Sequence, residues 1–506
     1  MRRRTTCTSL RERTSWSWWA TWRRSPLTAR RCTTHSRKDL DQQPVHVRHA
    51  VDADKPAQQR ESKQRTPKRR RRSLAVAAFG TVIEWYDFSI FFYVSTQLTR
   101  TFFHGDSNSL LLTLGVGAAG FLFRPLGAMV FGHLGERIGR KQALVISAVL
   151  MAVAMFGIAI LPGYDVLGVW AGILLVTLRC LAGFSVGAEY TGIMVYLMES
   201  AKQNRRGVAA SWAAANSELG SLLAVGGAAL LAHWLTADQM DSWGWRVLFV
   251  VGGLLAAAMI PLRRFMEETE TFEKLKQAGV AQRRKGSPLI DVLKHQPKAV
   301  LFAFLFSSIG SVTYFLNITN VPTYLESTAE VSNQLALNLG AIAAVAAIIA
   351  TPFIGLLSDK FGRRAMTLTL GLVLLVTTLP AYLLLAGTGN AGAVTGVALL
   401  AVPAAGWSAI GAAAIPEQFS ALGRFAGMAI GYNIATVLFG GFSPLVATAL
   451  IDATGNQFAP AYYATAIVVL FGIPLMWLMR DMAGKSLEEV DRDPVLRRAT
   501  AEKSRR

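Results

Sequence analysis

The sequence predicts an all-α integral membrane protein whose twelve transmembrane helices form two pseudo-symmetric six-helix bundles. Hydrophobic residues make up 52% of the 506 residues and charged residues only 17%. Two segments of 27 and 52 residues, Ala299–Leu325 and Ala365–Pro416, carry no Asp, Glu, Lys or Arg, whereas one spanning helix needs about 20 residues. A ten-residue motif also occurs twice, its second copy starting 223 residues after the first. These features exclude an ordinary soluble enzyme and a nucleic-acid-binding domain.

Charge-poor segments of helical length define the individual helices. The first six are 74–97, 110–132, 143–161, 169–198, 208–234 and 244–262. After a polar stretch, six more follow at 299–325, 334–357, 366–386, 391–415, 427–451 and 461–479. The predicted domains are therefore a tail over 1–73, an N-terminal bundle over 74–264, a central loop over 265–298, a C-terminal bundle over 299–480 and a second tail over 481–506.

The N-terminal tail holds most of the excess positive charge. Residues 1–73 carry 15 of the 20 net positive charges and no long apolar run, so the segment lacks the hydrophobic region of a secretory signal peptide. A disordered cytoplasmic tail and an upstream start site that the cell does not use are both compatible with residues 1–60. The basic run Lys68–Arg72 precedes the first helix, where it favours a cytoplasmic N-terminus and contact with anionic lipid.

Basic residues are distributed very unequally between the two sides of the predicted bundle. With the N-terminus inside, the cytoplasmic loops and both tails contain 48 of the 52 Lys and Arg residues, and the outer loops contain only Arg100. The positive-inside rule then places both termini in the cytoplasm. We expect a multi-pass protein of the cell (plasma) membrane, and membrane lipid is accordingly one of its partners.

The repeated motif follows the second and the eighth predicted helix. The copies Gly132–Lys141 and Gly355–Arg364 both read G-x-x-x-acid-base-x-G-R-base. Glycine permits close approach of helices, the acid can cap a helix N-terminus, and the basic cluster faces the inner leaflet. Two copies in the same register support an internal duplication of six helices.

This duplicated motif on twelve helices resembles the major facilitator superfamily. Four further segments are similar to the metabolite:proton symporter branch, which includes transporters for proline and betaine, 2-oxoglutarate, citrate and shikimate; they are Gly80–Phe88, Phe121–Gly127, Arg179–Glu189 and Trp243–Arg246. The resemblance covers residues 74–490 and implies alternating access by a protein that works as a monomer without a cofactor. It implies gating roles for Gly132, Glu136, Arg137, Gly139, Arg140, Gly355, Asp359, Gly362, Arg363 and Arg364.

Several charged residues fall inside predicted helices, where each costs roughly 2.5 to 3.5 kcal/mol at the bilayer centre. They are Glu84, Asp87, Arg124, Arg179, Glu189 and Glu218, all in the N-terminal half. Our hypothesis is that the acids of the first helix, with Arg124 and Arg179, form a proton-coupling network in the central cavity, and that Glu189 belongs to it. A permanent ion-pair lock is the alternative for the arginines and Asp87, and a gate at the cytoplasmic mouth for Glu84. Glu218 matches no motif.

Aromatic and amide side chains suggest a substrate site. A quaternary ammonium has no hydrogen-bond donor and binds aromatic faces, while a carboxylate binds Arg or amide donors. This pattern fits a zwitterionic osmolyte, although the same residues could simply pack helices. The candidates are Trp85, Tyr86, Phe88, Tyr314, Asn317, Tyr432 and Asn433.

The predicted function is secondary active transport of a small zwitterionic or anionic metabolite with protons. The segments 312–325 and 440–463 look more like proline/betaine members than 2-oxoglutarate members. A mono-, di- or tricarboxylate symporter and a non-transporting membrane sensor remain alternatives, and sodium could replace the proton. The sequence shows no zinc spacing and no catalytic constellation, so neither an enzyme nor a metal site nor a nucleic-acid partner is expected.

Overall fold

A computed structural model describes residues 67–103, 109–138, 140–187, 189–263, 288–329, 331–387, 389–421 and 423–487. Every regular element in these ranges is helical. The N-terminal half contains α3 (Pro67–Tyr93), α4 (Ser95–Phe102), α5 (Ser109–Ile138), α6 (Arg140–Ile160), α7 (Tyr164–Leu167), α8 (Val169–Ser185), α9 (Glu189–Ser200), η1 (Gln203–Arg205), α10 (Arg206–Trp234), α11 (Ala237–Gln239), η2 (Met240–Gly244) and α12 (Trp245–Leu262).

The C-terminal half follows the same plan. It contains α14 (Pro288–His295), α15 (Pro297–Tyr314), η4 (Phe315–Thr319), α16 (Val321–Ser327), α17 (Asn333–Phe361), α18 (Arg363–Gly387), α19 (Gly389–Ala414), η5 (Pro416–Gln418), α20 (Arg424–Thr436), η6 (Val437–Gly441), α21 (Ser443–Thr454) and α22 (Ala459–Leu478). The helix α14 lies within the predicted central loop, and its buried Val292 faces the protein because that helix packs on α20.

The structure confirms the predicted twelve-helix architecture. Eleven helices in the described ranges are long and apolar enough to cross a membrane, and α3, packed against α10 and α12, is the twelfth. Four of the predicted spans are interrupted: α3 passes to α4, α8 to α9, α15 to α16 and α20 to α21. Pro322 and Pro444 are the second residues of α16 and α21, and a π-helical turn precedes each of these two helices.

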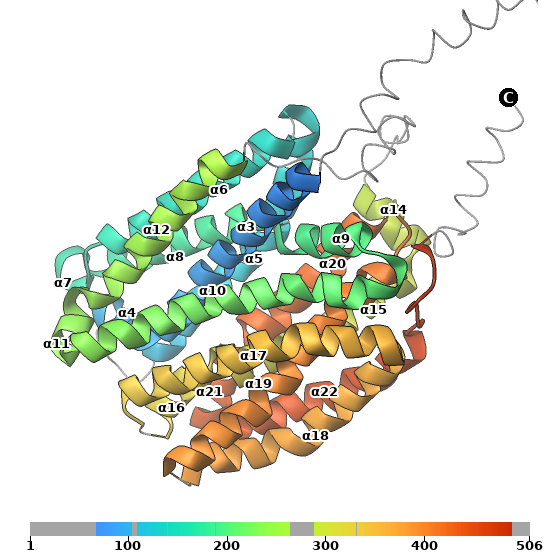
Figure 1. The fold of residues 1–506 in the computed structure, drawn as a ribbon. Helices are drawn as coiled ribbons and strands as arrows, with labels where there is room; N and C mark the ends of the chain where they lie inside the picture. The colour runs from blue at the N-terminus through green and yellow to red at the C-terminus, as the bar shows by residue number, and fades with distance from the viewer. Residues whose placement is uncertain are drawn as a thin grey trace, which may run out of the picture. The chain divides into compact units, whose positions relative to one another are not determined.

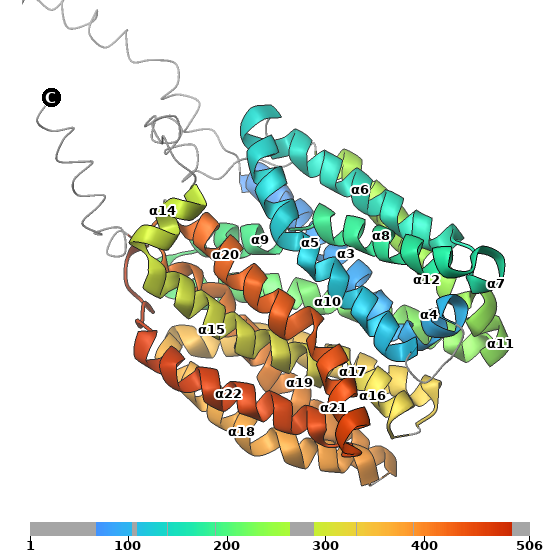
Figure 2. The same cartoon turned by 180° about the vertical axis from the view of Figure 1, so that it is seen from behind.

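The helices form two groups that meet along α10 and α17 (Figures 1 and 2). Within the first group α5 packs on α8, α6 on α12 and α3 on α10; within the second, α15 packs on α20 and α22, and α18 on α19. The groups also meet where α9 contacts α19 and α20.

Glycine determines how closely α5 and α8 approach each other. A Cβ atom at Gly183 would collide with the carbonyl oxygen of Gly120, and one at Gly127 with that of Phe184. Small residues at such crossings let helix backbones touch in a membrane, where dispersion contacts replace the hydrophobic effect. This close crossing carries Arg124 and Arg179 toward α3.

Candidate functional site

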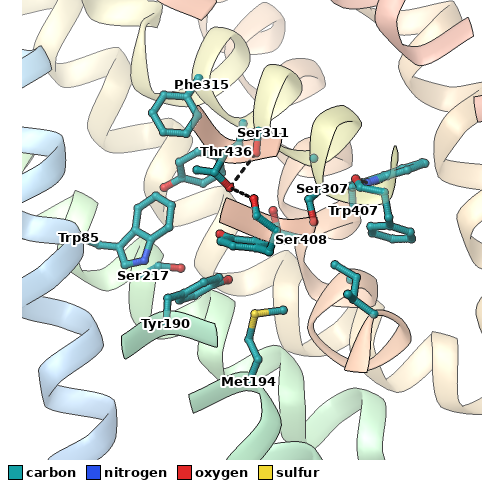
Figure 3. A pocket seen from close by; sticks show the side chains of 16 residues that line it. Trp85, Tyr190, Met194, Ser217, Ser307, Ser311, Phe315, Trp407, Ser408 and Thr436 are labelled. Atoms are coloured by element: carbon teal, nitrogen blue, oxygen red, sulfur yellow. Dashed lines mark hydrogen bonds between the residues drawn. The ribbon is translucent and has the colours of Figure 1, made fainter. Parts of the chain in front are cut away.

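A pocket lies between the two helix groups (Figure 3). Helices α3, α9 and α10 contribute from the first group, and α15, α19 and α20 contribute most of the lining from the second. The lining residues are Trp85, Tyr190, Met194, Ser217, Phe306, Ser307, Gly310, Ser311, Tyr314, Phe315, Trp407, Ser408, Gly411, Ile415, Tyr432 and Thr436. A site between two bundles is where small-molecule ligands of helical transporters are expected.

Four aromatic rings form one wall of the pocket, and Figure 3 shows Trp85 and Tyr190 facing it. The Trp85 ring centroid lies 5.1 Å from that of Tyr314 and 5.5 Å from that of Tyr190. The Tyr190 ring is in turn 5.5 Å from that of Tyr432. Clustered aromatic faces attract a desolvated organic cation through their quadrupoles.

The polar groups of the pocket are mostly hydroxyls. Ser311 donates to Thr436 over 3.4 Å, and the Ser307 hydroxyl has no hydrogen-bond partner among the described residues. The lining residues include no Lys, Arg, Asp or Glu. The pocket therefore presents aromatic rings and neutral hydroxyl groups.

Two buried ion pairs lie on α3 next to the aromatic wall. Glu84 Oε1 is 3.3 Å from Arg124 Nη1, and Asp87 Oδ2 is 3.2 Å from Arg179 Nη1. All four side chains are at most 7% exposed. The structure thus joins the acids of the first predicted span to the arginines of the second and fourth, although none of the four lines the pocket.

The two guanidinium groups stack on phenylalanine rings. Arg124 lies 4.8 Å from the Phe121 ring centroid, and Arg179 lies 4.7 Å from that of Phe91. Phe88 is within 5.5 Å of both guanidinium carbons. Aromatic contact offsets part of the cost of burying each cation. The substrate candidate Phe88 therefore contacts the buried arginines, and it is not among the residues that line the pocket.

Glu189 has a partner that sequence reasoning missed. Arg263 Nη2, at the end of α12, donates to both carboxylate oxygens over 2.6 and 2.5 Å. Gly80 makes room for this pair, since a Cβ there would collide with Glu189 Oε1. Arg263 directly follows the predicted helix 244–262, and hydropathy does not reveal that its side chain is only 1% exposed.

The remaining substrate candidates are divided between the pocket and the helix packing. Trp85, Tyr314 and Tyr432 line the pocket. Tyr86 donates to the Leu248 carbonyl over 2.8 Å, and Asn433 donates to the Gly187 carbonyl over 3.2 Å. Asn317 is fully buried in η4, away from the pocket lining, and its amide has no hydrogen-bond partner among the described residues.

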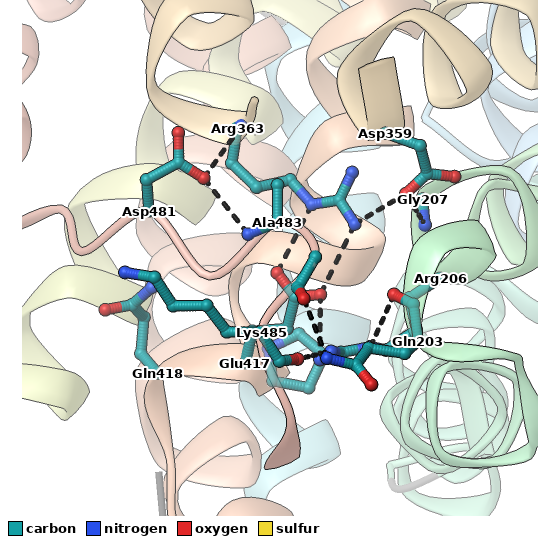
Figure 4. Close-up of polar contacts among 12 residues, drawn as sticks. Gln203, Arg206, Gly207, Asp359, Arg363, Glu417, Gln418, Asp481, Ala483 and Lys485 are labelled. Atoms are coloured by element: carbon teal, nitrogen blue, oxygen red, sulfur yellow. Dashed lines mark hydrogen bonds and ion pairs between the residues drawn. The ribbon is translucent and has the colours of Figure 1, made fainter. Parts of the chain in front are cut away.

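The second copy of the loop motif joins the two helix groups (Figure 4). Asp359 accepts hydrogen bonds from the backbone N–H groups of Gly207 and Val208 over 2.8 and 2.9 Å. These are the first unpaired amides of α10, and a carboxylate there also meets the positive end of the helix dipole. Gly355 permits the contact, because a Cβ would lie 2.5 Å from Ser211 Oγ and 2.9 Å from the Gly207 carbonyl.

Glu417 is the centre of a buried cluster that the sequence did not indicate. Arg206 Nη1 from the first group lies 3.3 Å from Glu417 Oε1, and Arg363 Nε from the second lies 3.2 Å from Oε2. Arg363 also donates to Asp359 over 2.8 Å. Glu417 follows the long uncharged segment, and only the fold places its carboxylate between two arginines (Figure 4).

Residues after α22 complete this contact. Asp481 accepts from the backbone N–H groups of Arg363 and Arg364 at the start of α18, and Gly362 adopts φ 93° just before it. Gln203 Nε2 donates to the Gly484 carbonyl over 2.7 Å. In the first copy, Gly139 lies outside the described residues, and for Gly132, Glu136, Arg137 and Arg140 the structure describes only the helical backbone.

The opposite end of the bundle also joins the two groups. Ser95 and Thr323 share a hydrogen bond of 3.4 Å, and Thr96 donates to Glu326 over 3.4 Å. The described residues therefore contact one another across the groups on both sides of the pocket. The described residues contain no cluster of His, Cys, Asp and Glu that could hold a metal ion.

Comparison with known proteins identifies the family. A model described as sugar (and other) transporter matches residues 74–493. The chain belongs to this transporter family. This transporter is 31% identical over 429 residues to the proline/betaine transporter of Escherichia coli K12, which covers 83% of the chain and 85% of the relative. It is 30% identical over 428 residues to the glycine betaine/proline/ectoine/pipecolic acid transporter OusA of Dickeya dadantii, with the same coverage of both chains.

Solved structures share the fold. The proton:xylose symporter XylE of the major facilitator superfamily matches with a TM-score of 0.64 at 20% identity, covering 83% of this transporter and 98% of that chain. This likeness confirms the predicted fold, and the family model with the curated relatives confirms a multi-pass membrane transporter.

Proposed function

We propose that this transporter carries a small zwitterion with a quaternary or substituted ammonium group, such as glycine betaine or proline, by proton symport. The four-ring wall of the pocket is the observation that supports this substrate class most strongly. It offers aromatic rings to a cation, because Trp85 contacts Tyr314 and Tyr190, and Tyr190 in turn contacts Tyr432. The named relatives transport solutes of this class.

The absence of charged side chains from the pocket lining disfavours the carboxylate substrates. A di- or tricarboxylate would need cationic partners, yet the residues that line the pocket include no Lys or Arg. A zwitterion needs fewer counter-ions because its own charges balance. Hydroxyls such as those of Ser307 and Ser311 can orient its carboxylate.

Proton coupling is assigned to the buried charges of the N-terminal half. We propose that Asp87, Glu84 and Glu189 exchange a proton while Arg124 and Arg179 stabilise the ionised carboxylates. A carboxylate next to a cation keeps its charge, and loss of that contact during rearrangement of the bundles favours protonation. Alternating access would move residues 74–264 against 299–480.

The proposed transporter has a fixed orientation in the membrane and a gate at its cytoplasmic end. We propose that both tails and the 265–298 loop lie in the cytoplasm, which the charge asymmetry favours, and that the protein resides in the plasma membrane. The Asp359, Arg363 and Glu417 contacts would then close the cytoplasmic end, and the protein would work as a monomer. These contacts must separate in each transport cycle for the pocket to open inward.

Counterflow in proteoliposomes tests the function. Vesicles loaded with unlabelled glycine betaine, proline, 2-oxoglutarate, citrate or shikimate are diluted into the labelled compound, with and without a protonophore. We expect exchange of glycine betaine or proline, and gradient-driven accumulation that the protonophore abolishes. Binding without exchange would indicate a sensor, and exchange of the carboxylates alone would refute the substrate class. A sodium gradient in place of the proton gradient tests the remaining coupling ion.

A further inference from the structure

Glu218 is a buried acid for which the transport scheme above has no role. It lies on α10 next to the pocket residue Ser217 and is 0% exposed. In the described part of the chain, the Tyr314 hydroxyl donates to Glu218 Oε2 over 3.3 Å, and Oε1 has no hydrogen-bond partner. Since Tyr314 belongs to α15, the contact joins the two helix groups beside the pocket.

The other fully buried acids have arginine partners. Glu84, Asp87 and Glu417 each lie within 3.3 Å of a guanidinium nitrogen. The structure gives Glu218 no such ion pair within the described ranges. Its carboxyl is therefore compensated by a single phenolic hydroxyl, a neutral donor.

Among the described residues, the titratable groups that interact with Glu218 are tyrosines, while Glu84 and Asp87 on the neighbouring α3 are paired with arginines. Tyr93 on α3, Tyr190 on α9 and Tyr314 on α15 interact with its carboxyl. Helix α19, which also packs on α10, contains no titratable residue. The titratable residues of α17 lie at its C-terminal end, where Asp359 accepts from the Gly207 N–H. Gly207 is eleven residues from Glu218, about 16 Å along a helix.

We propose that Glu218 is a proton-binding residue of the transport cycle, and that the two helix groups close around the pocket far more readily when its carboxyl is protonated. Burying a carboxylate without a cation or full hydrogen bonding is strongly unfavourable, whereas the neutral acid is tolerated. An open pocket would hydrate Glu218 and permit ionisation. Closure around the substrate therefore binds one proton from the water on the open side, and opening to the other side releases it there. The empty carrier returns with Glu218 ionised and solvated by water in the pocket.

Substrate enters this scheme through Tyr314. Its ring lines the pocket and its hydroxyl holds Glu218, so a solute that packs against the ring also fixes the hydroxyl. Substrate and proton then favour the same closed state. Symport also requires that the empty carrier returns without the proton, which water in the empty pocket permits by solvating the ionised carboxylate. This coupling step rests on the proposed function, whereas the dependence of closure on Glu218 does not.

The first experiment measures closure without substrate. Cys7, Cys32 and Cys180 are replaced by Ser, Ser307→Cys is introduced in the pocket, and the rate of maleimide labelling is followed against pH after correction for thiol ionisation. We expect labelling to speed up as pH rises, because ionised Glu218 opens the pocket. Glu218→Gln, which mimics the protonated acid, should label slowly at every pH. The matched control Asp452→Asn, at an exposed position of α21, should keep the profile.

The second experiment measures transport with the same variants. Glu218→Gln should retain counterflow and lose at least tenfold of the gradient-driven accumulation, and Tyr314→Phe should weaken both. An unchanged labelling profile, or unchanged accumulation, in Glu218→Gln would overturn the inference. If the wild type exchanges none of the tested solutes while the labelling difference is present, the proposed function fails and the role of Glu218 in closure stands.

Discussion

Asp87 and Arg179 illustrate how one buried pair can serve both stability and coupling. Their 3.2 Å contact lies inside the first helix group, where both side chains are at most 5% exposed. Removing one partner of a buried pair leaves an uncompensated charge and costs about 3–5 kcal/mol, whereas neutralising both partners is much cheaper. The two effects can therefore be separated by mutation.

We predict that Asp87→Asn lowers the thermal stability of the purified protein and that Asp87→Asn/Arg179→Gln largely restores it. The double variant should keep counterflow but lose accumulation driven by the proton gradient, because no carboxylate remains there to exchange a proton. Thermal unfolding in detergent and vesicle uptake measure the two outcomes. Full accumulation by the double variant would show that Asp87 is only a structural lock.

Trp85 contacts two of the other three rings in the aromatic wall. Its loss should remove about 2 kcal/mol of cation–π attraction to a desolvated ammonium group, which is about 30-fold in Kd. We predict this weakening for Trp85→Ala with glycine betaine in titration calorimetry, and a smaller one for Trp85→Phe. Trp477→Ala, at a position 83% exposed, is the matched control, and equal effects of both alanine variants would refute the site.

At the scale of the elements, the crossing of α5 and α8 determines where the arginines lie. Gly183 on α8 has no room for a Cβ, because that atom would collide with the Gly120 carbonyl of α5. A Cβ at Gly115, also on α5, would have no heavy atom within 4 Å. These two glycines give a matched comparison of packing with helix propensity.

We predict that Gly183→Ala destabilises the protein by about 1–3 kcal/mol, because the helices must separate to accept the methyl group. Gly115→Ala should be neutral or stabilising by up to about 1 kcal/mol, since alanine favours the helix. The melting temperatures of the purified variants measure both effects. Equal shifts for the two variants would contradict the close crossing.

At the scale of the whole molecule, the contacts of Asp359 decide how firmly the two helix groups hold together at one end. Its carboxylate accepts from two amides of α10 and one guanidinium nitrogen of Arg363. Replacing Asp359 by Asn removes the charge but keeps the shape of the side chain. This weakens the cap on the α10 N-terminus and the interaction with the helix dipole by about 1 kcal/mol.

We predict that Asp359→Asn raises the hydrogen-exchange rate of the first amides of α10 about fivefold, because local opening becomes about 1 kcal/mol easier. Mass spectrometry of peptides that cover residues 203–212 measures this change. Lys360→Gln is the control, since Lys360 is exposed and its ammonium group lies over the ring of the exposed Phe361. Protection that stays equal in the Asp359 variant would argue against a closing contact.

The amino-acid sequence by itself determined the number of helices and their approximate limits. Long apolar segments interrupted by charged loops are local properties, and a membrane admits few structures other than helices. It also indicated that Glu84, Asp87, Arg124 and Arg179 are buried, because charge inside an apolar segment is conspicuous.

Only the tertiary structure decided which groups meet. The pairing of Glu189 with Arg263, the position of Glu417 between Arg206 and Arg363, and the contact of Glu218 with Tyr314 join residues 54 to 211 positions apart. Such contacts depend on how each helix is rotated and how closely its small residues let it approach its neighbours. Neither property can be read from hydropathy, so the sequence established a membrane transporter and the fold established its pocket.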